Sequence, residues 1–349
     1  MNKHPEMTRI RRDEVTLADV FAANGYVTGL IGKWHTGAGE AYHPLKRGFR
    51  EFEGFFGSDK MTYSEYNLDA GGKRTEVRGK YLTENLSERA VAFVRRHRNE
   101  PFFLHLAHYA PHRPLEAPPE AVASYLKRGY DQNTATIYAM IEIMDRGIGA
   151  LMDELNHLGI RDNTLVIFGS DNGPDPITGS RFNLALRGMK YEIYEGGIRV
   201  PLAFNWPRAL PPGERNAVVH FTDIFPTLVE ICRLKQPPSV RRLDGVSLTA
   251  VLFNGVDQTN VPRFWQWNRA RPNYTHNGAM RDGPWKLVRP FVTRVDDPPD
   301  STEQPILYHL ATDPFETTNL AQQHPERYKS MLAALEAWSA EVERERVRP

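Results

Sequence analysis

Residues 16–37 read TLADVFAANGYVTGLIGKWHTG, and this stretch carries the first signal of the fold. Thr16 can cap a helix, Asp19 follows three positions later, and Gly25 stands where such a helix would stop. The next segment, YVTGLIG, is rich in residues that favour β-strands. A helix followed at once by a strand predicts α/β layering.

The same alternation continues along the chain. Residues 83–98 are amphipathic and lead into the apolar run PFFLHLAHYAPH, which is typical of a buried strand. Residues 133–158 place apolar side chains at helical spacing, with Gly159 as the expected cap. We expect the methionines of this stripe to pack in the core rather than to form a cofactor-binding face. TLVIFGSDNG and VPLAFNWP predict two further strands.

The pattern changes after about residue 255 to short strand-like pieces separated by Pro, Asp and Asn. RFWQWN, GAMRDGPWKLVR and PILYHLA predict a small antiparallel sheet. A last helix is expected over residues 325–345. We therefore predict a catalytic core over residues 1–255 and a C-terminal subdomain over residues 256–349.

The composition excludes several classes of protein. A net charge of +1 over 349 residues gives no support for a nucleic-acid binder. No window has the roughly 18 consecutive apolar residues that a membrane span needs. The polar start MNKHPEMTRIRRDE has no apolar signal region, which fits a cytoplasmic protein or, equally, a chain that has lost its beginning. Cys232 is the only cysteine, which rules out an intrachain disulfide, and its apolar neighbours predict a buried packing role. The sequence specifies no oligomeric state.

Polar side chains follow three of the predicted strands, where α/β sheets bind their ligands. Lys33 and His35 are two positions apart, so in extended geometry they face the same side and suggest an anion site. Surface charge at the end of a strand is the alternative. His112 stands between two prolines that could direct its imidazole toward a ligand, although a single histidine is often structural.

The third strand ends in Asp171-Asn172-Gly173, which offers a carboxylate and an amide oxygen to a hard cation. The same three residues are also a common turn signal. Lys190 lies in a glycine-rich loop that could bring an ammonium group to an oxyanion, with a solvated lysine as the alternative. Together these groups describe a pocket for a small oxyanion ester. Cations would stabilise the developing charge and a histidine would protonate the leaving group.

These motifs resemble those of the type I, formylglycine-dependent sulfatases of the alkaline-phosphatase superfold. GKWHTG is similar to their GKWHxG signature, with Thr36 where leucine is usual. Three more signatures of the family resemble segments of this chain. These segments are SDNG, PHRP and the stretch in which Lys190 is followed by EGGIRVP. The family pattern is also similar to three later segments, FPTL, DGVSL and LYHLATDPFETTNLA. The resemblance therefore covers nearly the whole chain. It implies an α/β fold with a mixed sheet flanked by helices and a small C-terminal antiparallel sheet.

The resemblance also implies roles for the candidate residues. Lys33 and His35 would contact the nucleophile and the sulfate. His112 and Lys190 would bind sulfate oxygens and assist the leaving group, and Asp171 and Asn172 would ligate Ca²⁺ or Mg²⁺. The substrate would be a small-molecule or saccharide sulfate ester, and relatives of this kind are often exported.

The sequence departs from the family pattern in one respect. Sulfatases begin with a strand bearing Asp-Asp-x-Gly, followed by Cys/Ser-x-Pro-x-Arg, whose first residue is oxidised to the formylglycine nucleophile; neither motif occurs here. We therefore expect an amino-terminally truncated core with unpaired sheet edges, two of the roughly six oxygen ligands that the metal prefers, and little or no turnover. A phosphonate or phosphate ester hydrolase of the same superfold and a non-catalytic remnant are the alternatives.

Overall fold

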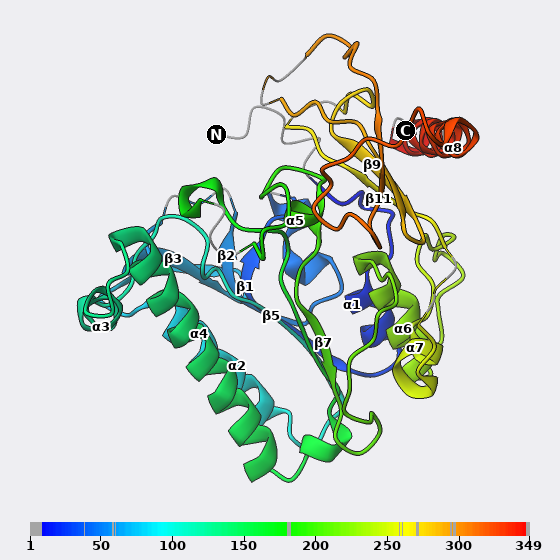
Figure 1. Ribbon diagram of the computed structural model, residues 1–349. Coiled ribbons are helices and arrows are strands. Elements are labelled where there is room, and N and C mark those ends of the chain that lie inside the picture. The colour runs from blue at the N-terminus through cyan, green and yellow to red at the C-terminus, as the bar shows by residue number, and fades with distance from the viewer. Residues whose placement is uncertain are drawn as a thin grey trace. The chain divides into compact units, whose positions relative to one another are not determined.

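The computed structural model describes residues 9–37, 39–57, 59, 61–179, 183–257, 259, 261–269, 272–293, 295 and 298–346 (Figure 1). The chain forms two compact units, which are described separately below. Unit 1 comprises Met1–Val166, Asn205–Pro212 and Phe221–Phe253, and unit 2 comprises Ile167–Phe204, Gly213–His220 and Asn254–Pro349. The assignment of residues 1–255 and 256–349 to two domains stays a prediction.

Unit 1 is built on a five-stranded mixed sheet in the order β4-β3-β2-β1-β5. β1 lies parallel to both of its neighbours, whereas β3 and β4 form an antiparallel hairpin beside β2. β1 is almost wholly buried, which explains why its sequence is apolar on both faces. The strands are Val27–Trp34 (β1), Glu51–Phe56 (β2), Glu65–Ala70 (β3), Lys73–Arg78 (β4) and Phe102–Ala107 (β5).

The predicted capped helix before β1 is confirmed. Thr16 accepts a hydrogen bond from the N–H of Asp19 at 3.1 Å, and the Asp19 carboxylate accepts the N–H of Thr16 at 2.8 Å. This reciprocal pair satisfies two of the N–H groups that a helix start leaves unpaired. The helices of unit 1 are Leu17–Ala23 (α1), Leu82–Arg96 (α2), Pro119–Leu126 (α3), Gln132–His157 (α4), Ile224–Ile231 (α6) and Thr249–Asn254 (α7).

The main core lies between the sheet and helices α2 and α4, which run side by side in Figure 1. Met140 is fully buried there, and Met144 and Met152 pack against the same cluster, so the predicted core role of the methionine stripe is confirmed. Ile141, an apolar residue of the same predicted stripe over residues 133–158, is instead 39% exposed. Cys232 is only half-buried at the C-terminal end of α6, where burial raises the pKa of its thiol.

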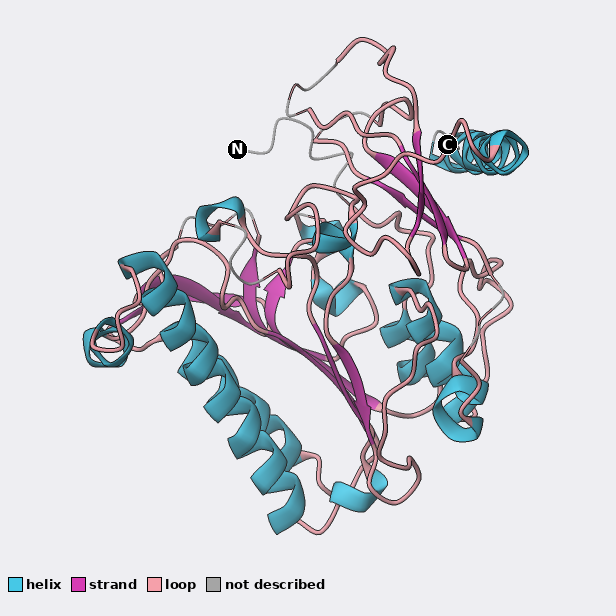
Figure 2. Cartoon of the chain, viewed as in Figure 1, coloured by secondary structure: helices cyan, strands magenta, loops and turns pink. Residues whose placement is uncertain are grey.

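Unit 2 contains the predicted antiparallel sheet, in the order β11-β10-β9-β8. Figure 2 shows this sheet in magenta beside α8, whose Met331 and Leu335 pack on Met280 and Leu287. β6 and β7, most of whose residues belong to unit 2, pair with each other in a two-stranded sheet. The elements are Val166–Gly169 (β6), Glu195–Ile198 (α5), Leu202–Asn205 (β7), Arg263–Gln266 (β8), Gly278–Asp282 (β9), Trp285–Val288 (β10), Ile306–His309 (β11) and Pro325–Arg346 (α8).

Short 3₁₀ helices connect several of these elements, at Glu40–Tyr42 (η2), Pro44–Lys46 (η3), Arg161–Asn163 (η4), Pro176–Thr178 (η5) and Phe221–Asp223 (η6). No helix among the described residues is long and apolar enough to cross a membrane.

Candidate functional site

The carboxyl end of β1 presents two of the predicted site residues. Lys33 is half-buried and His35, just beyond the strand, is exposed. Gly32 precedes them with φ of +112°, and a Cβ atom there would lie 2.0 Å from the carbonyl oxygen of Ala107 on β5. Only glycine fits this backbone conformation and close approach, so Gly32 fixes how β1 delivers Lys33 to the edge of the sheet.

The imidazole of His35 rests on the end of β2. A Cβ atom on Gly57 would lie 2.3 Å from Cδ2 of His35, so the ring lies directly against the glycine backbone. The N–H of Gly57 donates to the carbonyl oxygen of Trp34 at 2.7 Å. The end of β2 therefore lies directly against the His35 ring.

Tyr109 connects Lys33 with His112. The Nζ atom of Lys33 lies 5.5 Å from the centre of the Tyr109 ring, a cation–π distance. The ring of His112 stacks on Tyr109 with centroids 4.8 Å apart. Tyr63 and Phe55 pack against Tyr109 as well. The structure thus brings together two residues that are 79 positions apart, and sequence reasoning missed the tyrosine between them, three positions before His112.

The hydrogen bonds of His112 define its tautomer. Its Nδ1 atom lies 2.7 Å from the carbonyl oxygen of Arg113, so Nδ1 carries the hydrogen and donates it. Its backbone is also held, because its carbonyl oxygen accepts the hydroxyl of Tyr63 at 2.9 Å. The lone pair of the neutral ring is therefore on Nε2. This is the nitrogen that can take up a proton and release it.

His108, four residues earlier, is a half-buried histidine that sequence reasoning did not single out. Both of its ring nitrogens are enclosed, and neither has a hydrogen-bond partner among the described residues. Burial lowers the pKa of His108 to about 4. Its imidazole is therefore neutral at physiological pH.

In unit 2, main-chain hydrogen bonds join the Asp171-Asn172 turn to the loop that carries Lys190. The N–H of Gly173 donates to Gly197 at 2.9 Å, and the N–H of Lys190 donates to Pro174, also at 2.9 Å. The amide nitrogen of Asn172 donates to the carbonyl oxygen of Gly173, which leaves its Oδ1 atom as the acceptor of that side chain. Lys190 and the two predicted ligands thus belong to one connected segment.

The predicted ligands supply few donors for a metal ion. The carboxylate of Asp171 is exposed, and with Oδ1 of Asn172 it offers two kinds of hard oxygen, which suit Ca²⁺ or Mg²⁺. Within the described part of the chain, no group of three or more His, Cys, Asp or Glu residues could hold a metal ion. Asp171 and Asn172 therefore offer the type of ligand atom that a hard cation prefers, but too few of these atoms to complete its coordination.

A buried charge cluster supports the Lys190 loop. Nζ of Lys286 lies 2.9 Å from a carboxylate oxygen of Glu195 and 2.9 Å from one of Glu316. The other oxygen of Glu316 accepts the N–H of Glu195 at 2.7 Å, and Arg281 lies 3.3 Å from Glu195. Burial alone would raise the pKa of Glu195, but Lys286 and Arg281 lower it below its usual range. Burial dominates at Glu316 and raises its pKa.

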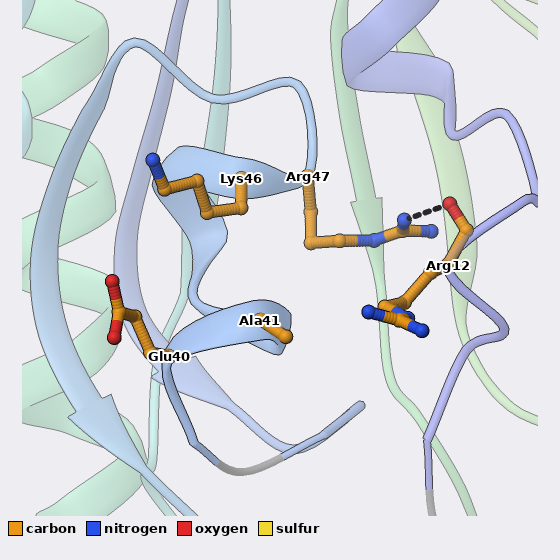
Figure 3. A pocket seen from close by; sticks show the side chains of 5 residues that line it. All are labelled: Arg12, Glu40, Ala41, Lys46 and Arg47. Atoms are coloured by element: carbon orange, nitrogen blue, oxygen red, sulfur yellow. Dashed lines mark hydrogen bonds between the residues drawn. The ribbon is translucent and has the colours of Figure 1, made fainter.

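Two hollows flank the segment Glu40–Lys46 that follows the β1 end. The first, of about 450 Å³, is lined by Arg12, Glu40, Ala41, Lys46 and Arg47 (Figure 3). Arg47 is buried and donates to the carbonyl oxygens of Arg11, Arg12 and Glu14, so it fixes the preceding loop rather than offering its charge to a ligand. The second hollow, of about 590 Å³, shares Glu40 and Lys46 with the first.

Comparison with known families gives two matches that together reach from residue 1 to residue 344. A family model described as Sulfatase matches residues 1–232. A second, described as N-sulphoglucosamine sulphohydrolase, C-terminal, matches residues 189–344.

Individual proteins agree with these matches. Arylsulfatase A of Bos taurus is 30% identical over 369 residues, which cover 93% of this chain and 70% of the relative. A protein of Escherichia coli K12 named Uncharacterized sulfatase YdeN is 29% identical over 266 residues, 67% of this chain and 46% of the relative. The chain thus spans from about half to 70% of the length of these relatives.

A solved structure is similar over nearly the whole chain. Ps i-CgsB, crystallised in complex with k-i-k-neocarrahexaose, is 27% identical with a TM-score of 0.84, covering 97% of this chain and 77% of that chain. The expected fold, a mixed sheet flanked by helices with a small antiparallel sheet, is confirmed.

Proposed function

This chain belongs to the sulfatase family, and on that premise we propose that it binds sulfate esters and hydrolyses them, although only slowly by itself. Hydrolysis breaks the bond between the sulfate group and an alcohol, and water supplies the oxygen and the hydrogen that complete the two products. The observation that carries the proposal is the Lys33–Tyr109–His112 arrangement. It places a cation and an imidazole against the same tyrosine ring, and the Nε2 atom of that imidazole can exchange a proton, as an oxyanion ester requires.

We assign the steps as follows. Lys33 and His35 bind the sulfate oxygens and stabilise the charge that develops on them. His112, once protonated, keeps its Nδ1 hydrogen on the carbonyl oxygen of Arg113 and donates the Nε2 hydrogen to the departing alcohol oxygen. Lys190 also binds sulfate oxygens.

Asp171 and Asn172 are our proposed ligands of a Ca²⁺ or Mg²⁺ ion, which when bound would stabilise negative charge on the sulfate. With two of the roughly six oxygen ligands such ions prefer, their affinity for the ion should be low. The substrate class is a small-molecule or saccharide sulfate ester. A relative solved with a neocarrahexaose supports the saccharide.

Sulfate binding tests the proposal directly. Replacing Lys33 with alanine should weaken binding of inorganic sulfate at least about 10-fold, because a hydrogen bond to a charged group contributes about 1.5–3 kcal/mol. Isothermal titration calorimetry measures this. Lys73→Ala, on the exposed strand β4, is the matched control and should bind sulfate as the unmodified chain does. Equal affinity in all three proteins would contradict the proposed role of the β1 end.

We further propose that this chain by itself turns over little substrate. Its 349 residues contain no Asp-Asp-x-Gly and no Cys-x-Pro-x-Arg or Ser-x-Pro-x-Arg. Purified protein should therefore hydrolyse 4-nitrophenyl sulfate far more slowly than the roughly 1 s⁻¹ at the low end of ordinary enzymes. Release of nitrophenolate measures the rate. A rate in the ordinary range would show that other residues supply the nucleophile, and faster hydrolysis of a phosphonate monoester would favour that ester class instead.

A further inference from the structure

We propose that Asn277, at one end of the C-terminal sheet, is a positioning residue for Lys190, an inference that rests on the proposed function. Lys190 is half-buried and is one of the groups assigned to the sulfate oxygens. The residue that follows it, Tyr191, has a φ of +82°. A bulky residue other than glycine rarely adopts this conformation, which persists only where surrounding contacts hold it. The contacts that hold Tyr191 therefore also set the backbone that carries the Lys190 side chain.

The side-chain amide of Asn277 holds the backbone of Tyr191. Its Nδ2 atom donates to the carbonyl oxygen of Tyr191 at 2.7 Å and to that of Trp267 at 3.1 Å. Because both partners are carbonyl oxygens, the nitrogen of the amide is the atom that faces them. On the other side of the lysine side chain, the N–H of Lys190 donates to the carbonyl oxygen of Pro174 at 2.9 Å. The backbone is thus fixed both before and after the Lys190 side chain.

Asn277 is itself held in place by the sheet. Only 1% of it is exposed, and its N–H donates to the carbonyl oxygen of Phe291 at 2.8 Å. Its carbonyl oxygen accepts the N–H of Trp267 at 3.2 Å. Asn277 directly precedes β9 and Trp267 directly follows β8, so both stand at the same end of two paired strands. The sheet therefore presents the amide of Asn277 to Tyr191 in a fixed position.

The ring of Tyr191 makes a second connection between Lys190 and the sheet. Nζ of Lys190 lies 5.5 Å from the centre of this ring, and the ring contacts that of Trp267 with centroids 5.1 Å apart. Ile193 and Tyr194, which follow closely, are buried in the core of the C-terminal sheet. Tyr191 accordingly joins the lysine to the sheet through both its backbone and its ring.

A purely stabilising role would not account for two costs that this arrangement carries. Tyr191 keeps a conformation that glycine would adopt freely. The Oδ1 atom of Asn277 is buried without a hydrogen-bond partner among the described residues. Strained or unsatisfied groups of this kind cluster at functional sites. The group that benefits here is Lys190, because a cation binds a sulfate oxygen well only from a fixed position.

Asn277→Gly tests the proposal, because it removes the amide and keeps a residue that accepts a φ of +35°. Asn319→Gly is the matched control, since the side chain of Asn319 also bonds the main chain of unit 2, but through the N–H groups of Leu307 and Ala321. Isothermal titration calorimetry would measure the affinity of these variants, of Lys190→Ala and of the double variant Lys190→Ala/Asn277→Gly for inorganic sulfate. Urea denaturation would show that each variant is folded.

We expect Lys190→Ala to weaken sulfate binding about 10-fold and Asn277→Gly about 5-fold, whereas Asn319→Gly should bind sulfate as the unmodified chain does. The double variant should bind no more weakly than Lys190→Ala, because Asn277 acts through a lysine that is then absent. The positioning role is wrong if Asn277→Gly binds sulfate normally, if the two losses multiply in the double variant, or if Asn319→Gly weakens binding equally.

Tyr191→Gly keeps the proposal testable if Asn277→Gly does not fold. Glycine adopts a φ of +82° freely, so this variant should fold, but it loses the ring between Lys190 and Trp267 and gains backbone freedom. We expect about 5-fold weaker sulfate binding, again only while Lys190 is present, and unchanged affinity would contradict the proposal. If Lys190→Ala binds sulfate as tightly as the unmodified chain, the proposed function of Lys190 fails, and the positioning role fails with it.

Discussion

Replacing Lys286 with methionine is expected to lower the free energy of unfolding by about 3–5 kcal/mol. Lys286 is fully buried and is the cation shared by the carboxylates of Glu195 and Glu316, which are also buried. Methionine fills a similar volume but leaves the buried Glu316 carboxylate without its cation and Glu195 with Arg281 alone, which lies 3.3 Å away. The loss is therefore that of an uncompensated buried charge, and it far exceeds the roughly 0–1 kcal/mol of an exposed ion pair.

Urea denaturation followed by tryptophan fluorescence measures the change, since Trp265, Trp285 and Trp338 lie in unit 2. Lys73→Met removes an exposed lysine and should change stability by no more than about 0.5 kcal/mol. Adding Glu316→Gln to Lys286→Met should restore part of the lost unfolding free energy, because one of the two buried carboxylate charges is then removed. Equal stability of Lys286→Met and Lys73→Met would show that the cluster does not stabilise unit 2.

Lowering the pH from 8 to 4 should destabilise the protein through His108 by about 3 kcal/mol. Burial holds the pKa of His108 at about 4 in the folded chain, against 6.5 for an unperturbed histidine. Each change of one in pKa corresponds to about 1.4 kcal/mol. Between these values the unfolded chain binds a proton that the folded chain does not. The stabilisation is therefore complete above pH 6.5 and is lost as the pH falls toward 4.

His108→Leu isolates this contribution from the titration of the carboxylates, which also changes stability in acid. The quantity to compare is the difference in unfolding free energy between the unmodified chain and the variant at pH 8, 6, 5 and 4. That difference should move by about 3 kcal/mol in favour of the variant as the pH falls. A difference that stays constant would mean that His108 is protonated in the folded chain without cost.

Much of the fold could be predicted because its signals are local. The capping pair of Thr16 and Asp19, the long apolar stripe of α4 and the punctuated strands after residue 255 each lie within a short window. The β3–β4 hairpin was missed for a physical reason. Five of the six residues of β4, KRTEVR, are exposed, so the strand has no apolar alternation by which to recognise it.

The candidate site could be predicted in part. Lys33 lies at the carboxyl end of a strand and His35 and His112 follow strands, and the rule that ligands bind at strand ends was enough to single them out. Nothing local marks Tyr109 as the ring between two of them, since aromatic residues are common in apolar strands. The roles of Lys286 and Glu316 are even harder to predict from the sequence. Their roles depend on contacts with Glu195 across 91 and 121 residues, which only the assembled fold creates.

Those long separations have a consequence during synthesis. A ribosome adds about 5–20 residues per second, so Glu316 emerges about 6–24 s after Glu195. Until Arg281 and Lys286 have emerged, the Glu195 carboxylate stays hydrated, and until Glu316 has emerged, the N–H of Glu195 lacks its acceptor. The Lys190 loop can therefore reach its final conformation only after strand β11 has left the exit tunnel. Unit 2 therefore completes its folding later than the β1–β5 sheet, whose strands have all emerged before Glu195 is made.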